Sequence, residues 1–101
     1  EGVVTRLAEM DGALRRRRRE LADQIERAAM SLMLNLGEST GNHGGNRRLR
    51  LETAAGSAAE LRGALRFGVL WGHVDGTRGA ELDRDLDRVM AMLWRLRARC
   101  R

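Results

Sequence analysis

The chain of 101 residues contains no proline, lysine or tyrosine, and it has one cysteine, one phenylalanine and two tryptophans. Proline, the residue that most strongly disrupts a helix, is absent, and the abundance of alanine, leucine, arginine and glutamate predicts an all-α fold. The single Cys100 excludes an internal disulfide, and no apolar run approaches the roughly 18 residues of a membrane span. Because no secretory signal is recognisable, we expect a soluble protein of the reducing cytoplasm.

Basic charge in this sequence is carried by arginine alone. Nineteen arginines face fourteen acidic residues, which gives a net charge of +5 at pH 7. Uniform use of arginine fits either GC-rich coding or recognition of phosphate by the planar guanidinium group. Three aromatic residues are too few to stack successive bases, so we expect any contact with nucleic acid to be made mainly to the backbone.

Apolar residues recur at helical spacing along most of the chain. The length suits one domain, spanning residues 1–101. Steps of three and four residues run through two stripes that begin at Val3 and Leu21, and strict heptad seams begin at Leu51 and Leu82. Segments 41–46 and 72–79 are rich in glycine and other turn formers, so they separate the later helices.

The break between the first two stripes has a weaker signal, because Asp11 and Gly12 are its only turn formers. One bent helix over residues 1–38 is the alternative to a turn between residues 11 and 18. We favour the turn, since a single uncapped helix of about 38 residues is unusual in so small a domain. The sequence then predicts four helices of about 10, 19, 25 and 20 residues in an up-down-up-down four-helix bundle.

Residues 28–37 carry more apolar side chains than one core stripe requires. The surplus Met30, Met33 and Leu34 would form an exposed apolar patch on a single bundle, and such patches usually mark an interface. We therefore expect a homo-oligomer that uses these three residues. A wide core seam in a monomer is the alternative.

Residue types that carry chemistry are sparse. His43, His73 and Cys100 are too few for a zinc site of usual spacing, and no Glu-x-x-His pair suggests a di-iron centre. Cys100 has no histidine near it in sequence, and segment 41–46 lacks the Gly-Lys-Ser/Thr ending of a nucleotide loop. We expect no catalytic residues, no metal and no cofactor, hence a protein that is not an enzyme.

The arginines become informative once the helix directions alternate. The end of the second predicted helix, the start of the third and the C-terminus then share one end of the bundle, where seven arginines face few acids. Such a surface could hold the phosphate backbone of RNA or DNA. At the other end, we expect the arginine run at 15–19 to be largely cancelled by acids at the start of the last helix, although those acids could simply complement its dipole. The candidate nucleic-acid-binding residues are Arg47, Arg48, Arg50, Arg95, Arg97, Arg99 and Arg101.

A further set of residues forms a recognisable signature in the second and third predicted helices. The signature residues are Gln24, Arg27, Asn35, Glu38, Gly56, Ser57 and Glu60. Their pattern resembles that of the four-helix-bundle family that includes the proteins encoded in ribosomal RNA intervening sequences and the accessory variability determinants of diversity-generating retroelements. The resemblance implies a ring-shaped homopentamer and, for the retroelement branch, a basic surface that binds nucleic acid and a partner reverse transcriptase. A module that docks a protein partner without binding nucleic acid is the alternative.

We expect these signature residues to be structural. If the second and third helices pair around residues 42 and 43, Arg27 lies beside Glu60 and the two should form an ion pair. Gly56 should allow the two helices to approach closely, which would account for the roughly 1 kcal/mol that glycine costs within a helix.

Overall fold

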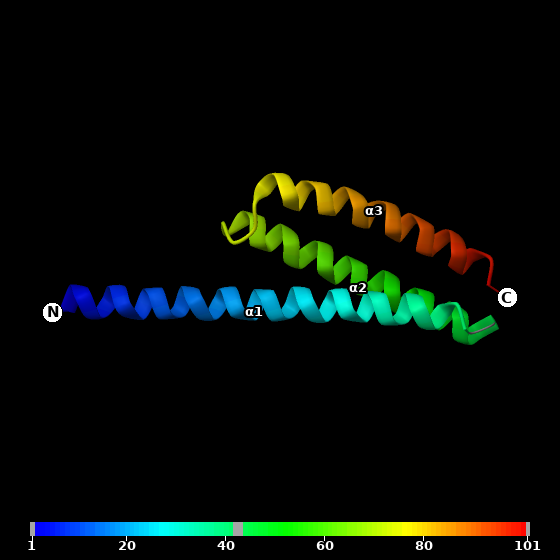
Figure 1. Ribbon diagram of the computed structural model, residues 1–101, viewed down its shortest axis with the longest axis horizontal. Coiled ribbons are helices and arrows are strands. Elements are labelled where there is room, and N and C mark those ends of the chain that lie inside the picture. The colour runs from blue at the N-terminus through cyan, green and yellow to red at the C-terminus, as the bar shows by residue number, and fades with distance from the viewer. Residues whose placement is uncertain (1, 42–43, 101) are drawn as a thin grey trace.

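The computed structural model describes residues 2–41 and 44–100, which form three helices (Figure 1). These are α1 (Gly2–Ser39), α2 (Gly44–Leu70) and α3 (Gly76–Ala98). The described residues include no strand, so the all-α prediction is confirmed. The predicted count of four helices is wrong, because residues 2–39 form one continuous helix.

Helix α1 runs straight through the turn predicted between residues 11 and 18. The Asp11 carboxylate forms an ion pair with the Arg15 guanidinium, one helical turn further on, and Asp11 Oδ2 lies 3.0 Å from Arg15 Nε. This i, i+4 pairing favours the helix, and Gly12 lowers helix propensity by only about 1 kcal/mol. Two weak turn formers therefore do not interrupt a segment that is otherwise made of helix-favouring residues.

Helix α2 lies between α1 and α3 and packs against both (Figure 1). Within the described residues, no Cα atom of α1 comes within 8 Å of one in α3, and the molecule measures 66 × 24 × 14 Å. The predicted seam of α2 is buried from Leu51 to Gly68. Two side chains are fully buried, Leu51 of α2 and Leu93 of α3. The core is therefore a narrow layer along the two faces of α2.

The turn between α2 and α3 is fixed by glycines and by backbone hydrogen bonds. Gly72 has a φ of +76°, a conformation that favours glycine, and the Gly68 carbonyl accepts from His73 N at 2.7 Å. A Cβ atom on Gly68 would lie 2.6 Å from Val74 Cγ2, so no larger residue fits there without a shift. Asp75 then caps α3 by accepting from Arg78 N at 3.0 Å.

The first part of α1 extends past the α2–α3 hairpin (Figure 1). Residues 2–14 of this helix, called the arm below, are exposed except for a partly buried Ala13. Val3, Leu7, Met10 and Leu14 keep between 42% and 67% of their surface exposed. The apolar stripe predicted for these residues is thus present, but the residues that the structure describes leave it exposed.

Candidate nucleic-acid interface

The end of α1, the start of α2 and the end of α3 lie together at one end of the molecule (Figure 1). This arrangement brings six of the seven candidate arginines to the same end, as the sequence analysis predicts. They are Arg47, Arg48, Arg50, Arg95, Arg97 and Arg99, whereas Arg101 lies outside the described residues.

Three of these arginines are held by contacts within the fold. Arg97 donates to Glu52 at 2.7 Å and also lies over the ring of Trp94. Arg50 pairs with Glu38 at 3.0 Å, and Arg48 donates to the Cys100 carbonyl at 3.0 Å. Their charges are partly offset by these partners, so they join the helices at this end as well as contributing positive charge.

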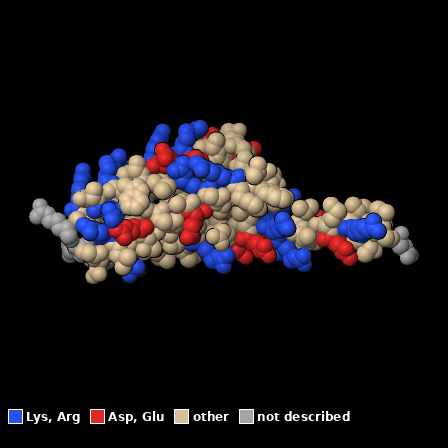
Figure 2. All heavy atoms as spheres, turned by 180° about the vertical axis from the view of Figure 1, so that it is seen from behind, with Lys and Arg blue, Asp and Glu red and all other residues tan. Residues whose placement is uncertain are grey.

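Arg95 and Arg99 are different, because both are exposed and neither forms an ion pair with the described residues. Arg84 and Arg88 lie on the same face of α3 as these two arginines, which the sequence analysis did not predict. The four residues, in the order Arg84, Arg88, Arg95 and Arg99, follow one another at steps of four, seven and four. All four side chains are exposed. Figure 2 shows basic side chains projecting from the edge of the molecule that α3 forms. A search for i, i+4 and i, i+7 spacing among arginines alone could have found this row, called the α3 arginine row below.

Two signature residues, Ser57 and Asn35, form a polar chain with Ser31 between α1 and α2. The Ser57 hydroxyl on α2 lies 2.7 Å from the Ser31 hydroxyl on α1, and it is buried. Asn35 Nδ2 donates to the Ser31 carbonyl at 2.8 Å, and Asn35 Oδ1 accepts from Arg50 at 3.3 Å. Together with Glu38, these residues connect the α1–α2 interface to the basic end.

The ion pair predicted between Arg27 and Glu60 is absent from the described subunit. Arg27 instead donates to Gln24 on its own helix at 3.4 Å, and both Arg27 and Glu60 are exposed. Gln24 and Glu60 line one groove between α1 and α2, whereas Arg27 lies with Met30 on the outer side of α1. The ion-pair prediction gave the right pair of helices but ignored the rotation of about 100° per residue around α1.

Gly56 does not mark the close approach of two helices that the sequence analysis predicts for it. It is exposed, and a Cβ atom placed on it would have nothing within 4 Å. Close approach of the helices comes instead from small buried residues beside it, among them Ala54, Ala55 and Ala58.

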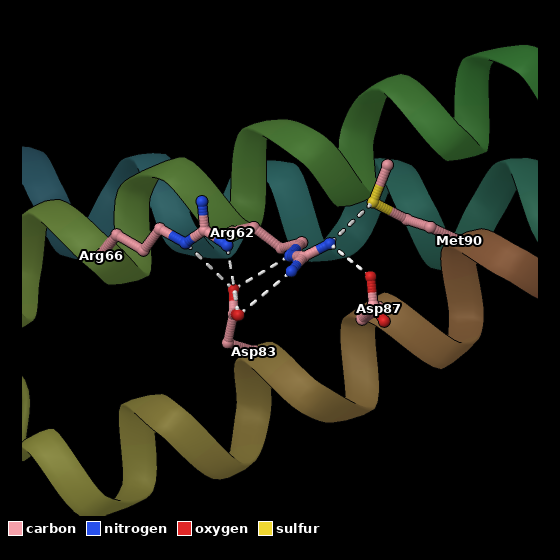
Figure 3. Close-up of polar contacts among 5 residues, drawn as sticks. All are labelled: Arg62, Arg66, Asp83, Asp87 and Met90. Atoms are coloured by element: carbon pink, nitrogen blue, oxygen red, sulfur yellow. Dashed lines mark hydrogen bonds and ion pairs between the residues drawn. The ribbon is translucent and has the colours of Figure 1, made fainter.

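The most extensive ionic cluster joins α2 to the start of α3 (Figure 3). Arg62 grips both carboxylate oxygens of Asp83, at 2.9 and 3.0 Å, and Arg66 contacts the same carboxylate at 3.2 Å. The hydrogen bonds from Arg62 and then Arg66 hold the pKa of Asp83 well below its usual range. Arg62 also reaches Asp87 at 3.1 Å.

The acids of α3 do not cancel the positive charge of the arginine run at 15–19, so this prediction is wrong. Asp83 and Asp87 are paired with arginines of α2, on the helix that lies between α1 and α3. Within the run, Arg15 pairs with Asp11, Arg18 donates to His73 at 3.1 Å, and Arg17 lies over the Trp71 ring. Most of the charge of this run therefore stays exposed at the end opposite the basic end.

The predicted interface residues Met30, Met33 and Leu34 are 60%, 69% and 59% exposed. They lie on the outer side of α1, away from α2, so they are not part of a wide core seam.

In the described part of the chain, no helix has the length and apolarity needed to cross a membrane. The same residues include no group of three or more histidine, cysteine, aspartate or glutamate side chains that could hold a metal ion, and His43 falls outside them.

Fold and surface together define a small antiparallel helical protein with one arginine-rich end and an exposed row of arginines along α3. The family model for 23S rRNA-intervening sequence proteins matches residues 4–95, and the chain belongs to this family. The family resemblance carried by the signature residues is therefore confirmed. Comparison with curated proteins and with solved structures gives no match.

Proposed function

We propose that this chain is a non-enzymatic, homo-oligomeric scaffold that binds RNA or DNA through the phosphate backbone. The observation that carries the proposal is the α3 arginine row, whose four exposed guanidinium groups form no ion pair with the described residues. Neighbours four residues apart on a helix are separated by about 6 Å along its axis, so the row presents a line of positive charge about 22 Å long. A line of charge suits a phosphate backbone better than it suits a single small anion.

The rest of the basic end supports the same role. Arg48, Arg50 and Arg97 are held in place by contacts with neighbouring helices, which fixes the end of α3 relative to α1 and α2. Positions fixed before binding reduce the ordering cost of recognition. The family's link to ribosomal RNA intervening sequences favours an RNA duplex as the first probe, ahead of the partner reverse transcriptase that the retroelement branch implies.

Binding should be measured with a labelled RNA duplex of about 20 base pairs over a salt series from about 50 to 200 mM. The variant Arg95→Gln/Arg99→Gln removes two unpaired charges from the α3 arginine row. If each contacts one phosphate, the slope of log affinity against log salt should flatten by about 0.9 for each arginine. The matched control Arg16→Gln/Arg19→Gln removes the same charge from the opposite end.

Equal losses in the two variants would mean that total charge, and not the α3 arginine row, determines binding. Absence of binding by the parental protein at about 50 mM salt would overturn the nucleic-acid role. The module that docks a protein partner would then be the better description.

Homo-oligomer formation is the second part of the proposal. Met30, Met33 and Leu34 form an exposed apolar patch on the outer side of α1, and burying such a patch against another copy is favourable. The family resemblance favours a ring of five copies. Light scattering of Met33→Glu/Leu34→Glu should show loss of the parental assembly, and an unchanged mass would exclude this patch as the interface.

A further inference from the structure

A second apolar surface of α1 is left uncovered by the described residues of the subunit. The arm exposes a stripe formed by Val3, Leu7, Met10 and Leu14, and this stripe continues directly into the buried Leu21. Helices of about 12–15 residues or fewer are marginal in water without packing. A helical arm of 13 residues that projects past the hairpin therefore calls for a surface to cover it.

The subunit also contains an open apolar groove, on the side of α2 where α1 and α3 stay apart. Its volume is about 280 Å³, and its floor is formed by Leu61 and Leu65 of α2. Ile25 and Ala29 of α1 line one wall, and the other wall is formed on α3 by Leu82, Leu86, Val89 and the single charged residue Asp85. In a four-helix arrangement, a fourth helix would lie over this groove, antiparallel to α1 and α3.

The groove can receive the part of the arm nearest the rest of α1. On α3 the groove runs from Leu82 to Val89, which are about 10 Å apart along the helix. The arm stripe from Val3 to Leu14 spans about 16 Å, so Met10 and Leu14 fit within the groove and Val3 extends beyond it. Both surfaces repeat at helical spacing, as two helices that pack along their axes require.

The arm cannot reach the groove of its own subunit while α1 stays continuous. Helix α1 carries the arm past the α2–α3 turn, away from the groove, which lies beside residues 25 and 29 of the same helix (Figure 1). Bringing it back would require a break in the backbone between residues 14 and 21, where the helix is regular.

We propose that the arm of one copy lies in the groove between α1 and α3 of a second copy and completes a four-helix packing there. Antiparallel to α3, an arm that places Leu14 beside Leu82 and Met10 beside Val89 brings the arginine run at 15–19 next to the start of α3. Asp85 lies on the rim of the groove at that point and forms no ion pair with the described residues of its own subunit. Opposite charges therefore meet at the mouth of the groove, in addition to the apolar match along it.

The arm–groove contact is separate from the patch formed by Met30, Met33 and Leu34, which lies on the outer side of α1. It extends the proposed homo-oligomer by a second contact, and it does not depend on nucleic-acid binding. Each of the three surfaces can therefore fail in experiment without affecting the other two.

The test is disulfide trapping in a Cys100→Ser background. Met10→Cys combined with Val89→Cys should form a covalent product of two or more chains on a non-reducing denaturing gel, and each single-cysteine variant should stay largely uncrosslinked. A crosslink confined to one chain would show that the arm folds onto its own subunit. Crosslinking by Met10→Cys alone, as efficient as by the pair, would show that arms pair with arms; either result overturns the proposal, as does the absence of any crosslink.

Light scattering provides the second measurement. Met10→Glu places a charge in the proposed contact, at a position 60% exposed in the subunit, so the mass should fall while the helical content of α2 and α3 is kept. The matched control Ala8→Glu adds the same charge on another side of the arm and should keep the parental mass. A monomeric parental protein, or equal masses for the two variants, would overturn the proposal.

Discussion

Two parts of the same helix behave in opposite ways. In the arm, Leu7 and Leu14 are 59% and 42% exposed, whereas Leu21 and Leu32 further along the same stripe are 9% and 7% exposed. The residue types and their spacing are alike, so helical periodicity alone does not produce burial. What differs is the presence of α2, which ends at Leu70 and covers only the later part of α1. An amphipathic stripe therefore indicates a helix and the need for a partner, but not where that partner comes from.

The largest expected effect comes from truncating a side chain in the packed part. Leu93 of α3 is fully buried where α3 packs against α2. Leu93→Ala should therefore lower the free energy of unfolding by about 2–5 kcal/mol. The matched arm variant Leu7→Ala removes the same atoms from an exposed site and should change the stability of one subunit little. Urea denaturation of both variants measures the difference. Equal losses would break the comparison, because the arm would then be as buried as the core in the protein being unfolded.

The next effect concerns acid stability. Arg62 and Arg66 lower the pKa of Asp83 in the folded state, so the unfolded state binds a proton more readily. The stabilisation is therefore complete above the usual aspartate pKa of about 3.9 and is lost as the pH falls below it. Asp83→Asn should be less stable than the parent near neutral pH and should lose less stability between about pH 5 and pH 2.

The arm supplies the control for this acid experiment. The ion pair of Asp11 with Arg15 is exposed at both ends, with 58% and 69% of the side chains accessible, so it contributes little. Asp11→Asn should keep the acid dependence of the parent in urea midpoints measured at each pH. If Asp83→Asn kept the parental acid dependence as well, the Arg62–Asp83 cluster would not be its source.

A smaller effect is expected at the polar contact between α1 and α2. Ser57→Ala removes a buried hydroxyl that lies 2.7 Å from the Ser31 hydroxyl, and it should cost about 1 kcal/mol. Thr53→Ala is the matched control, because the exposed Thr53 hydroxyl donates to the Leu49 carbonyl of its own helix and joins no second helix among the described residues. Adding Ser31→Ala to Ser57→Ala should cost less than the sum of the single changes. Strict additivity in this double-mutant cycle would show that the two hydroxyls do not interact.

Much of the local structure could be predicted from the sequence, because helical spacing and glycine-rich breaks are local signals. The seam from Leu51 to Gly68, both later breaks and the gathering of arginines at one end depend only on such signals and on alternating helix direction. The helix count is harder to predict, because Asp11 and Gly12 favour a turn only weakly and no other helix of the described residues covers the arm. The usual length of helices in small domains favours a break there, whereas the local sequence favours one helix.

The details of the candidate site were harder to predict, because they depend on rotation around each helix and on exact register. Ser31 with Ser57 and Arg50 with Glu38 place α1 and α2 within one residue of the register that pairs Arg27 with Glu60. The side of α1 on which Arg27 lies therefore decides the outcome, and that side faces away from Glu60. The Arg62–Asp83 cluster was missed for a different reason. The sequence analysis expects Asp83 and Asp87 to face the arginine run at 15–19, whereas α2 packs against α3 and supplies their partner Arg62.

The smallest expected effect tests what a helical glycine does in each part of the molecule. Gly56 in α2 and Gly12 in the arm both lie in helices, and a Cβ atom on either would have nothing within 4 Å. Gly56→Ala should therefore stabilise the protein by about 0.5–1 kcal/mol, since alanine loses less backbone entropy on entering a helix. At concentrations low enough to give single subunits, Gly12→Ala should raise the helical content seen by circular dichroism without moving the urea midpoint, because the arm can fray while the rest stays folded. In the assembled protein, where the arm is packed in the groove of another copy, the same change should raise the midpoint as well. A midpoint raised equally in single subunits would mean that the arm unfolds together with the core of its own subunit. A destabilising Gly56→Ala would instead show that another chain approaches α2 at this position.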